Sequence, residues 1–150
     1  ESILLPVKKE LVDLLYDPAQ WVVTPDPRQH DRRSVYLVAK RNLRLPFLEV
    51  FDQPDLQISC PRRQSSTHAP QALELLNGEI ANDLAAALAD RLRTEAGTDP
   101  AAQVERAFWL ALGRPPQPAE RRLALDFLRS EPLEELALAM LNLNAFLYVD

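Results

Sequence analysis

Cysteine, glycine and histidine are scarce in this chain of 150 residues. With one cysteine it cannot form an internal disulfide framework, and it lacks the grouped thiols of a zinc ribbon. Only three glycines are present, and the sequence contains neither a glycine-rich phosphate loop nor a serine nucleophile elbow. These absences exclude a disulfide-stapled fold, a zinc ribbon and a P-loop nucleotide site.

Long hydrophobic runs are also missing. The most apolar stretch, residues 136–149, contains Asn142 and Asn144 and is shorter than the roughly 20 residues that a membrane-spanning helix needs. We therefore expect no membrane span. The chain begins with Glu1, and no basic and apolar leader follows it, so we expect a processed or cut piece of a longer protein.

The charge is unevenly distributed along the chain, whose net charge is -5. Residues 28–63 contain eight basic and four acidic side chains, a balance of +4, whereas the rest contains nine basic and eighteen acidic ones, a balance of -9. An acidic protein is a poor nucleic-acid binder, so we expect no nucleic-acid partner. The basic segment is suited to phosphate, to an anionic glycan or to the protein's own acidic helices, and we favour the helices.

The length fits one compact domain, residues 1–150, and thirteen prolines divide it into two halves. The first half, to about residue 69, reads as irregular and proline-rich. It contains a short helix within residues 6–18, a loop held by prolines at residues 21–29, and a short helix from Pro46 to before Pro54. Residues 33–43 fit a strand or a helix, and we lean towards an extended segment, which would give this half a short β segment.

The second half is predicted to be helical, which makes the fold mainly α. Asn77-Gly78, Gly97 and Gly113 are typical of helix ends, the first pair as a left-handed turn, and Asp99-Pro100 is typical of a helix start. Short connections between the helices predict a small antiparallel bundle over residues 70–146. The side chains that we expect to face inward are Ile80, Leu84, Leu88 and Leu92, with Ala81 and Ala85 beside them, and Val104, Ala107, Phe108, Ala111, Leu112, Leu123, Ala124, Phe127, Leu128, Leu136, Ala139, Met140 and Leu143.

One turn-rich stretch, "SCPRRQSSTHAP", gathers reactive side chains. Cys60 and His68 are eight residues apart, and a thiolate with an imidazole base can perform acyl transfer, but no third, orienting group is evident. Cys60, His68 and His30 would suffice for zinc with one carboxylate, yet their spacing matches no zinc motif. We assign no catalytic residue, no metal ligand and no cofactor-binding residue in this chain.

The function that we keep open for this stretch is anion binding. We interpret Ser65, Ser66 and Thr67 as caps of a helix that begins near Pro70. The exposed N–H groups at such a helix start bind anions, and nearby guanidinium groups strengthen that binding. The candidate anion-binding residues are Arg32, Arg33, Arg62, Arg63 and Thr67.

Five stretches, in order, resemble one known family: "DRRSVYLVAKRN", "FLEVFDQPD", "CPRRQSSTHAPQALELLN", "AFWLALGRPPQPAE" and "LNLNAFLYVD". Together they are similar to the C-terminal part of the planctomycete-specific family called domain of unknown function 1553. The resemblance covers residues 31–150, whereas residues 1–30 match it poorly. The family's usual Thr-Asn-Thr-Pro-Leu-Gln-Ala-Leu is "SSTHAPQAL" here, so His68 is not a hallmark of the family.

The resemblance implies a larger exported protein, in the periplasm or secreted, in which a haem-binding, cytochrome-c-like domain comes first. This chain has no Cys-x-x-Cys-His motif, so any haem would belong to the upstream domains and not to this piece. The family has no established reaction, and it supplies no catalytic residues to transfer.

Two functions are compatible with these observations. The one we prefer is a non-catalytic helical module that contacts other domains of the parent protein or a protein partner. The alternative is a non-autonomous enzyme component that binds a sulfated or carboxylated glycan through the arginine-rich segment. Candidate arginines that face solvent in a concave cluster would favour the alternative, and arginines paired with carboxylates or carbonyls would favour the module.

Overall fold

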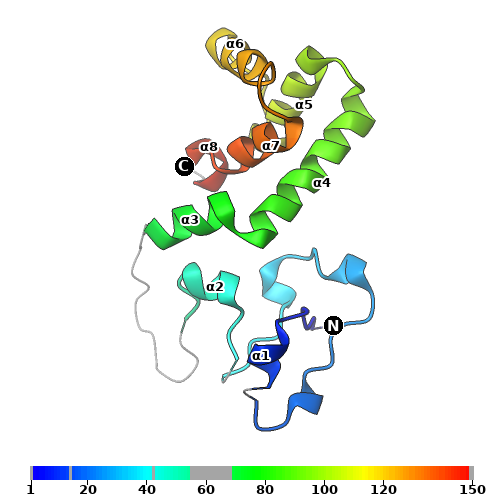
Figure 1. Ribbon diagram of the computed structural model, residues 1–150, viewed down its shortest axis with the longest axis vertical. Coiled ribbons are helices and arrows are strands. Elements are labelled where there is room, and N and C mark those ends of the chain that lie inside the picture. The colour runs from blue at the N-terminus through cyan, green and yellow to red at the C-terminus, as the bar shows by residue number, and fades with distance from the viewer. Residues whose placement is uncertain (1, 14, 42, 55–68, 149–150) are drawn as a thin grey trace. The chain divides into compact units, whose positions relative to one another are not determined.

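The computed structural model describes residues 2–13, 15–41, 43–54 and 69–148 and has two compact units, residues 1–67 and 68–150. Figure 1 shows that helices dominate the second unit, whereas the first is mostly irregular chain with short helices. Within the described ranges the only β pairing is two isolated bridges, so the mainly α fold is confirmed. That the two units form one domain stays a prediction.

Short helices make up the first unit. They are α1 (Lys9–Val12), the 3-10 helices η1 (Pro18–Gln20), η2 (Pro27–Gln29) and η3 (Ser34–Tyr36), and α2 (Pro46–Val50). Proline begins three of them, because its fixed φ suits the first turn of a helix and its missing N–H is not needed there. The helix predicted to open at Pro46 is therefore confirmed.

The segment predicted as extended, residues 33–43, is mixed. It begins with the 3-10 turn η3 and continues without regular structure through two bridges, one between Ile3 and Leu37 and one between Lys40 and Leu43. The backbone N–H of Ile3 donates to Tyr36 O at 2.8 Å, and that of Val38 donates to Ile3 O at 2.8 Å. The expected β segment is thus reduced to single-residue pairing.

Trp21 is the largest buried side chain in the core of the first unit. Its indole N–H donates to Leu5 O at 3.0 Å, so its polar atom is satisfied while the ring packs with other apolar residues. Leu15, Leu43 and Leu45 are buried in the same cluster. This small core connects parts of the chain from residue 4 to residue 48.

The second unit is a bundle of α3 (Ala69–Asn77), α4 (Glu79–Ala96), α5 (Pro100–Leu112), α6 (Pro118–Phe127), α7 (Leu133–Leu141) and α8 (Asn144–Leu147). Arg93, near the end of α4, lies 2.7 Å from Glu134 at the start of α7. At the other end of α7, the Asn142 side chain donates to Leu75 O on α3 at 3.0 Å. These two contacts show that α4 and α7 run antiparallel, as the sequence predicts.

Two helix ends have the conformation that the sequence predicts, and a third does not. Asp99 accepts hydrogen bonds from Ala101 N and Ala102 N at 3.2 Å, and Gly113 ends α5 with a φ of 66°. Gly78, in contrast, has φ -66° and ψ 144°, so the predicted left-handed turn is wrong. Glycine is needed there because a Cβ would overlap the main-chain oxygen of Glu74.

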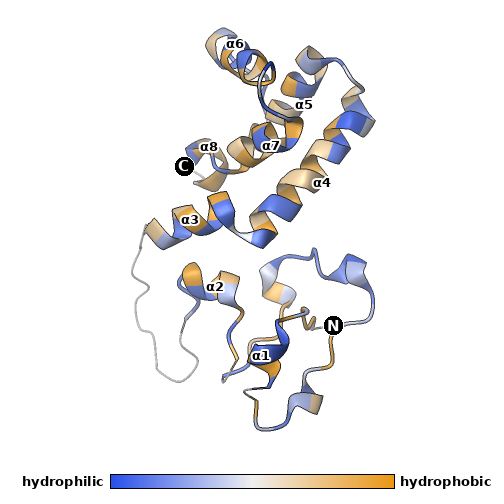
Figure 2. Ribbon diagram, in the orientation of Figure 1, coloured by the Kyte–Doolittle hydropathy of each residue, from blue (hydrophilic) through white to orange (hydrophobic). Residues whose placement is uncertain are grey.

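Alanine side chains form the inner face of α4. Ala81, Ala85 and Ala89 are buried there with Leu92, in the same core as the largely apolar α7 (Figure 2). The inward stripe predicted through Ile80 and Leu84 is wrong at these two positions, because they are 44% and 51% exposed. We call the buried face of α4 the alanine face.

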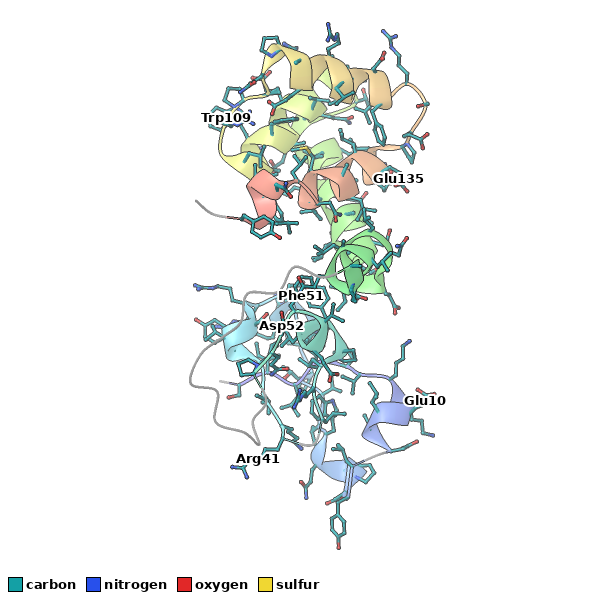
Figure 3. The ribbon with its side chains drawn as sticks, turned by 90° about the vertical axis from the view of Figure 1, so that its left-hand side faces the viewer. Glu10, Arg41, Phe51, Asp52, Trp109 and Glu135 are labelled. Carbon is teal, nitrogen blue, oxygen red and sulfur yellow. The ribbon has the colours of Figure 1, made fainter. Side chains whose placement is uncertain are left out.

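Several other predicted core positions also face solvent. Trp109 lies at the outer surface of the second unit, where Figure 3 labels it. Tyr148 is also 54% exposed. The predicted inward positions that the structure exposes, apart from those on α4, are Leu123, Phe127, Ala139 and Leu143. Helix periodicity alone does not distinguish these positions from their buried neighbours.

Ala89→Leu should destabilise the second unit by about 1–3 kcal/mol, because Ala89 has no exposed surface and added methyl groups would force α4 and α7 apart. Ala86→Leu is the matched control, since Ala86 is exposed on the same helix. Urea unfolding followed by circular dichroism measures both variants. Equal stability of the two would contradict close packing at the alanine face.

Candidate functional site

The structure describes two of the five residues of the predicted anion site. Arg62, Arg63 and Thr67 lie outside the described residues, as do Cys60 and His68. The caps proposed at Ser65 and Ser66 lie outside them too. The joint anion site therefore stays a prediction, and only Arg32 and Arg33 can be placed.

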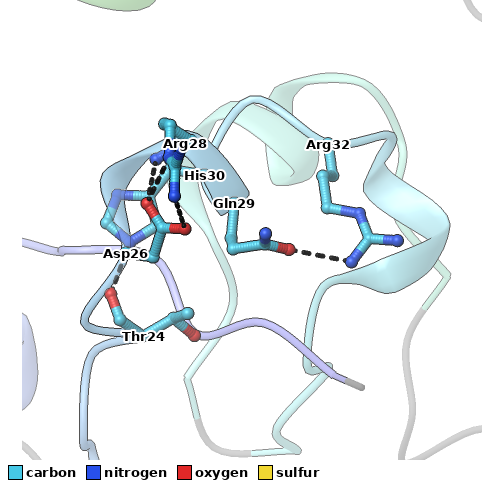
Figure 4. A network of polar contacts seen from close by, with 6 residues as sticks. All are labelled: Thr24, Asp26, Arg28, Gln29, His30 and Arg32. Carbon is cyan, nitrogen blue, oxygen red and sulfur yellow. Dashed lines mark hydrogen bonds and ion pairs between the residues drawn. The ribbon is translucent and has the colours of Figure 1, made fainter.

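Arg32 and Arg33 come directly before the 3-10 turn η3. Figure 4 shows Arg32 and its contact with Gln29. The Arg32 guanidinium donates to Gln29 Oε1 at 2.9 Å, and its carbon lies 4.4 Å from the centre of the Tyr36 ring. Arg33 precedes the turn, and its side chain is exposed. Arg32 is thus held by neutral groups of its own unit, through a hydrogen bond and a cation–π contact.

A polar network orders the loop before η3, as Figure 4 shows. Asp26 Oδ1 lies 3.1 Å from Arg28 Nε, and the hydrogen bonds from Arg28 lower the pKa of Asp26. His30 Nε2 lies 2.8 Å from Thr24 O, and because a carbonyl only accepts, this ring nitrogen carries the proton. His30 is half-buried in this contact, and its role here is structural.

Other cations of the basic segment also contact groups of the first unit. Lys40 Nζ donates to Gln20 O at 3.1 Å and lies 5.5 Å from the centre of the Trp21 ring. Arg44 lies 3.9 Å from Glu49. These contacts join residues of one unit, and docking of the segment on the acidic helices stays a prediction.

Arg114 organises the connection between α5 and α6. Its two terminal nitrogens donate to the two carboxylate oxygens of Glu120 at 2.8 and 2.7 Å, and its guanidinium lies 5.8 Å from the centre of the Phe108 ring. Glu120 also accepts from Gln117 N at 2.7 Å, which completes a capping box. The Arg114 and Gln117 hydrogen bonds lower the pKa of Glu120 to about 2.

A second ion-pair network connects α4 with α5 and α7. Glu95 lies between Arg91 and Arg106, at 2.7 and 2.5 Å, and the hydrogen bonds from these guanidinium groups lower its pKa. Arg93 bonds both Asp90 and Glu134, and the hydrogen bonds from these carboxylates, that from Glu134 foremost, raise its pKa. These pairs lie at the helix surface, so they serve to fix helix positions.

The outer face of α6 contains a shallow depression that the sequence reading missed. It is lined by Pro116, Pro118, Arg121, Arg122, Leu125, Asp126 and Arg129. Arg129 lies 3.0 Å from Asp126. We call this surface the α6 depression. The adjacent arginines Arg121 and Arg122 are visible in the sequence, but they lie in its acidic part, where a charge count along the chain gives no sign of a cationic surface.

In the described ranges, no three His, Cys, Asp or Glu side chains are grouped so that they could hold a metal ion. No helix in these ranges is both long enough and apolar enough to cross a bilayer. The shifted pKa values described above belong to surface arginine–carboxylate pairs.

Comparison with known families gives one match. A family model described as "Protein of unknown function (DUF1553)", PSD1, matches residues 6–128. The chain belongs to this family. The DUF1553 match begins before residue 31, where the quoted motifs start, and it ends at Leu128, before α7. No curated protein and no solved structure matches the chain.

The Arg114–Glu120 pair makes a pH-dependent contribution to stability in this DUF1553 protein. Glu120 has a folded-state pKa of about 2 against 4.5 without these contacts, so its contribution is complete above pH 4.5 and is lost as the pH falls towards 2. We expect Glu120→Gln to lower the melting temperature slightly at neutral pH and to remove this part of the acid dependence. The effect should be small, since the pair is partly exposed.

Thermal unfolding at several pH values between neutral and about 2 measures this effect. Glu131→Gln is the control, because Glu131 is an exposed glutamate just after the same helix. If both variants show the same acid dependence as the unmodified chain, the pair does not have the proposed effect.

Proposed function

We propose that the second unit is a helical interaction module that docks on another part of a larger parent protein through the outer side of α3 and the first turns of α4. The observation that carries this proposal is the exposure of four large apolar side chains in these helices: Leu73, Leu76, Ile80 and Leu84. We call these four residues the α3–α4 surface.

The spacing of these residues supports a common role. Leu73 and Leu76 are three residues apart on α3, and Ile80 and Leu84 are four residues apart on α4, so each pair lies on one face of its helix. Burying one such side chain stabilises a complex by roughly 1.5–3 kcal/mol. Grouped exposed apolar residues are typical of protein interaction sites, whereas scattered ones are ordinary.

The end of α7 positions further apolar side chains near α3. Asn142 donates to Leu75 O at 3.0 Å and to Leu138 O at 2.8 Å, which ties the end of α7 to α3. Helix α8 follows directly, and its Phe146 and Leu147 are partly exposed. Their exposure supports an apolar contact region at this end of the unit.

The proposal also concerns the parent protein to which this chain belongs. We infer that the parent is an exported, extracytoplasmic planctomycete protein, that this chain lies in its C-terminal part, and that any haem is bound by upstream domains. The support is the resemblance of the quoted motifs to the family. The partner is another domain of that parent protein.

Glycan binding through the arginine-rich segment is the weaker alternative. Of its candidate residues, Arg32 is engaged by Gln29 and Tyr36, which leaves fewer of its donors for a sulfate or carboxylate. Arg33 is exposed and agrees with either function.

The test compares the full-length parent protein with its variant Ile80→Gln, Leu84→Gln by hydrogen–deuterium exchange. We expect faster exchange in residues 69–86 and also in one segment outside residues 1–150, because the contact between the two is lost. The melting temperature of the second unit should change little, since both side chains are exposed.

Leu123→Gln is the matched control, because Leu123 is an exposed apolar residue on α6, outside the α3–α4 surface. It should leave both segments unchanged. Faster exchange confined to residues 69–86, or no change, would show that this surface contacts no other domain.

A further inference from the structure

The α6 depression has a regular origin in the helix. Pro118, Arg121, Arg122 and Leu125 follow one another at intervals of one or three residues, which places them on one side of α6. Pro116 and Arg129, which lie just outside the two ends of the helix, complete the lining. The buried Ala124 lies on the opposite side and packs in the core of the unit. The depression is therefore a solvent-exposed face of α6, a helix whose one buried residue is Ala124.

The α6 depression is positively charged, whereas the unit around it is negatively charged. Residues 69–148 contain seven arginines, no lysine and twelve carboxylates, a net charge of -5. The depression contains three of those arginines and one carboxylate, Asp126. It is a local cationic surface on an acidic unit, and such a surface attracts anionic ligands selectively.

Two guanidinium groups in the depression are free. Five of the seven arginines make ion pairs, namely Arg91, Arg93, Arg106, Arg114 and Arg129. Across the part of the chain that the structure describes, the side chains of Arg121 and Arg122 have neither an ion pair nor a hydrogen bond. Both are exposed, so their donors are available to a ligand.

The surface is also rigid. Pro116 and Pro118 have fixed φ angles, and the bidentate Arg114–Glu120 pair holds the connector that contains them. A ligand that binds here orders only side chains, which lowers the entropy cost of binding.

We propose that the α6 depression binds a short acidic peptide segment of a partner protein. Carboxylates of the segment pair with Arg121 and Arg122, whose planar guanidinium groups suit bidentate contacts. An apolar side chain of the segment packs on Pro116, Pro118 and Leu125. The arginines supply specificity for acidic residues, and the prolines supply contact area.

An acidic peptide fits better than a long polyanion. A nucleic acid or sulfated polysaccharide extends its charge beyond the depression, where the carboxylates of this acidic unit repel it. A short peptide confines its charge to the depression, and it brings side chains that use the apolar lining.

This site is separate from the α3–α4 surface. Figures 1 and 3 both place α6 and α3 at opposite ends of the second unit. Binding to the α6 depression therefore does not depend on the proposed docking through α3 and α4, and the two proposals fail independently.

The test is fluorescence anisotropy with the whole chain of 150 residues and a labelled peptide of alternating glutamate and leucine. We expect binding that weakens when salt rises from about 0.02 to about 0.2 M. Arg121→Glu with Arg122→Glu should weaken it by about tenfold or more, since it replaces attraction by repulsion. The neutral pair Arg121→Gln with Arg122→Gln should give a smaller loss.

Lys8→Glu with Lys9→Glu is the control for net charge, because it makes the same change of charge at exposed positions of the first unit. It should leave peptide affinity nearly unchanged, and circular dichroism confirms that each variant is folded. Equal losses in the two charge reversals, or unchanged binding in both arginine variants, would overturn the proposal. Tighter binding of a sulfated oligosaccharide or single-stranded DNA than of the peptide would overturn it as well.

Discussion

Close packing of α4 against α7 is the interaction on which the second unit depends. Ala81, Ala85 and Ala89 give α4 a face without bulk, which lets α7 approach closely, and the resulting core contains Leu136 and Met140. Polar contacts then hold both ends of α7, through Arg93 of α4 with Glu134 at its start and through Asn142 with Leu75 O of α3 at its end. Register and direction thus follow from small residues in the middle and specific bonds at the ends.

The same packing decides which residues remain for function. The alanine face of α4 is turned inward. Ile80 and Leu84 lie about 100° away from it around the helix axis, and they are therefore exposed to solvent. A helix that uses its larger apolar residues for its own core has none left for a partner. Here the core uses the alanines and Leu92, and Ile80 and Leu84 remain for the surface that we propose as an interaction site.

Local features of this fold could be read from the sequence, whereas the choice of helix face could not. Asp99, Gly97 and Gly113 mark helix ends through their own conformational preferences, so their roles need no distant contact. Along α4, the leucine-rich stripe through Ile80 and Leu84 and the alanine stripe through Ala81 and Ala85 both end at Leu92. Hydrophobicity alone favours the leucine-rich stripe as the buried one. The position of α7 selects the alanine stripe, and nothing local to α4 encodes that position. The α6 depression was missed for a similar reason, since charge counted along the chain does not show which arginines are left unpaired in three dimensions.

The two proposed surfaces differ in the physics by which they would recognise partners. Apolar contact at the α3–α4 surface supplies affinity with little directional preference, whereas guanidinium–carboxylate pairing in the α6 depression depends on geometry and salt. The α4–α7 packing and the Arg114–Glu120 pair hold these surfaces at a fixed separation within one unit. Partners that occupy both surfaces at once must match that separation. Two contacts that are each modest in affinity would then together give tighter binding in one defined orientation.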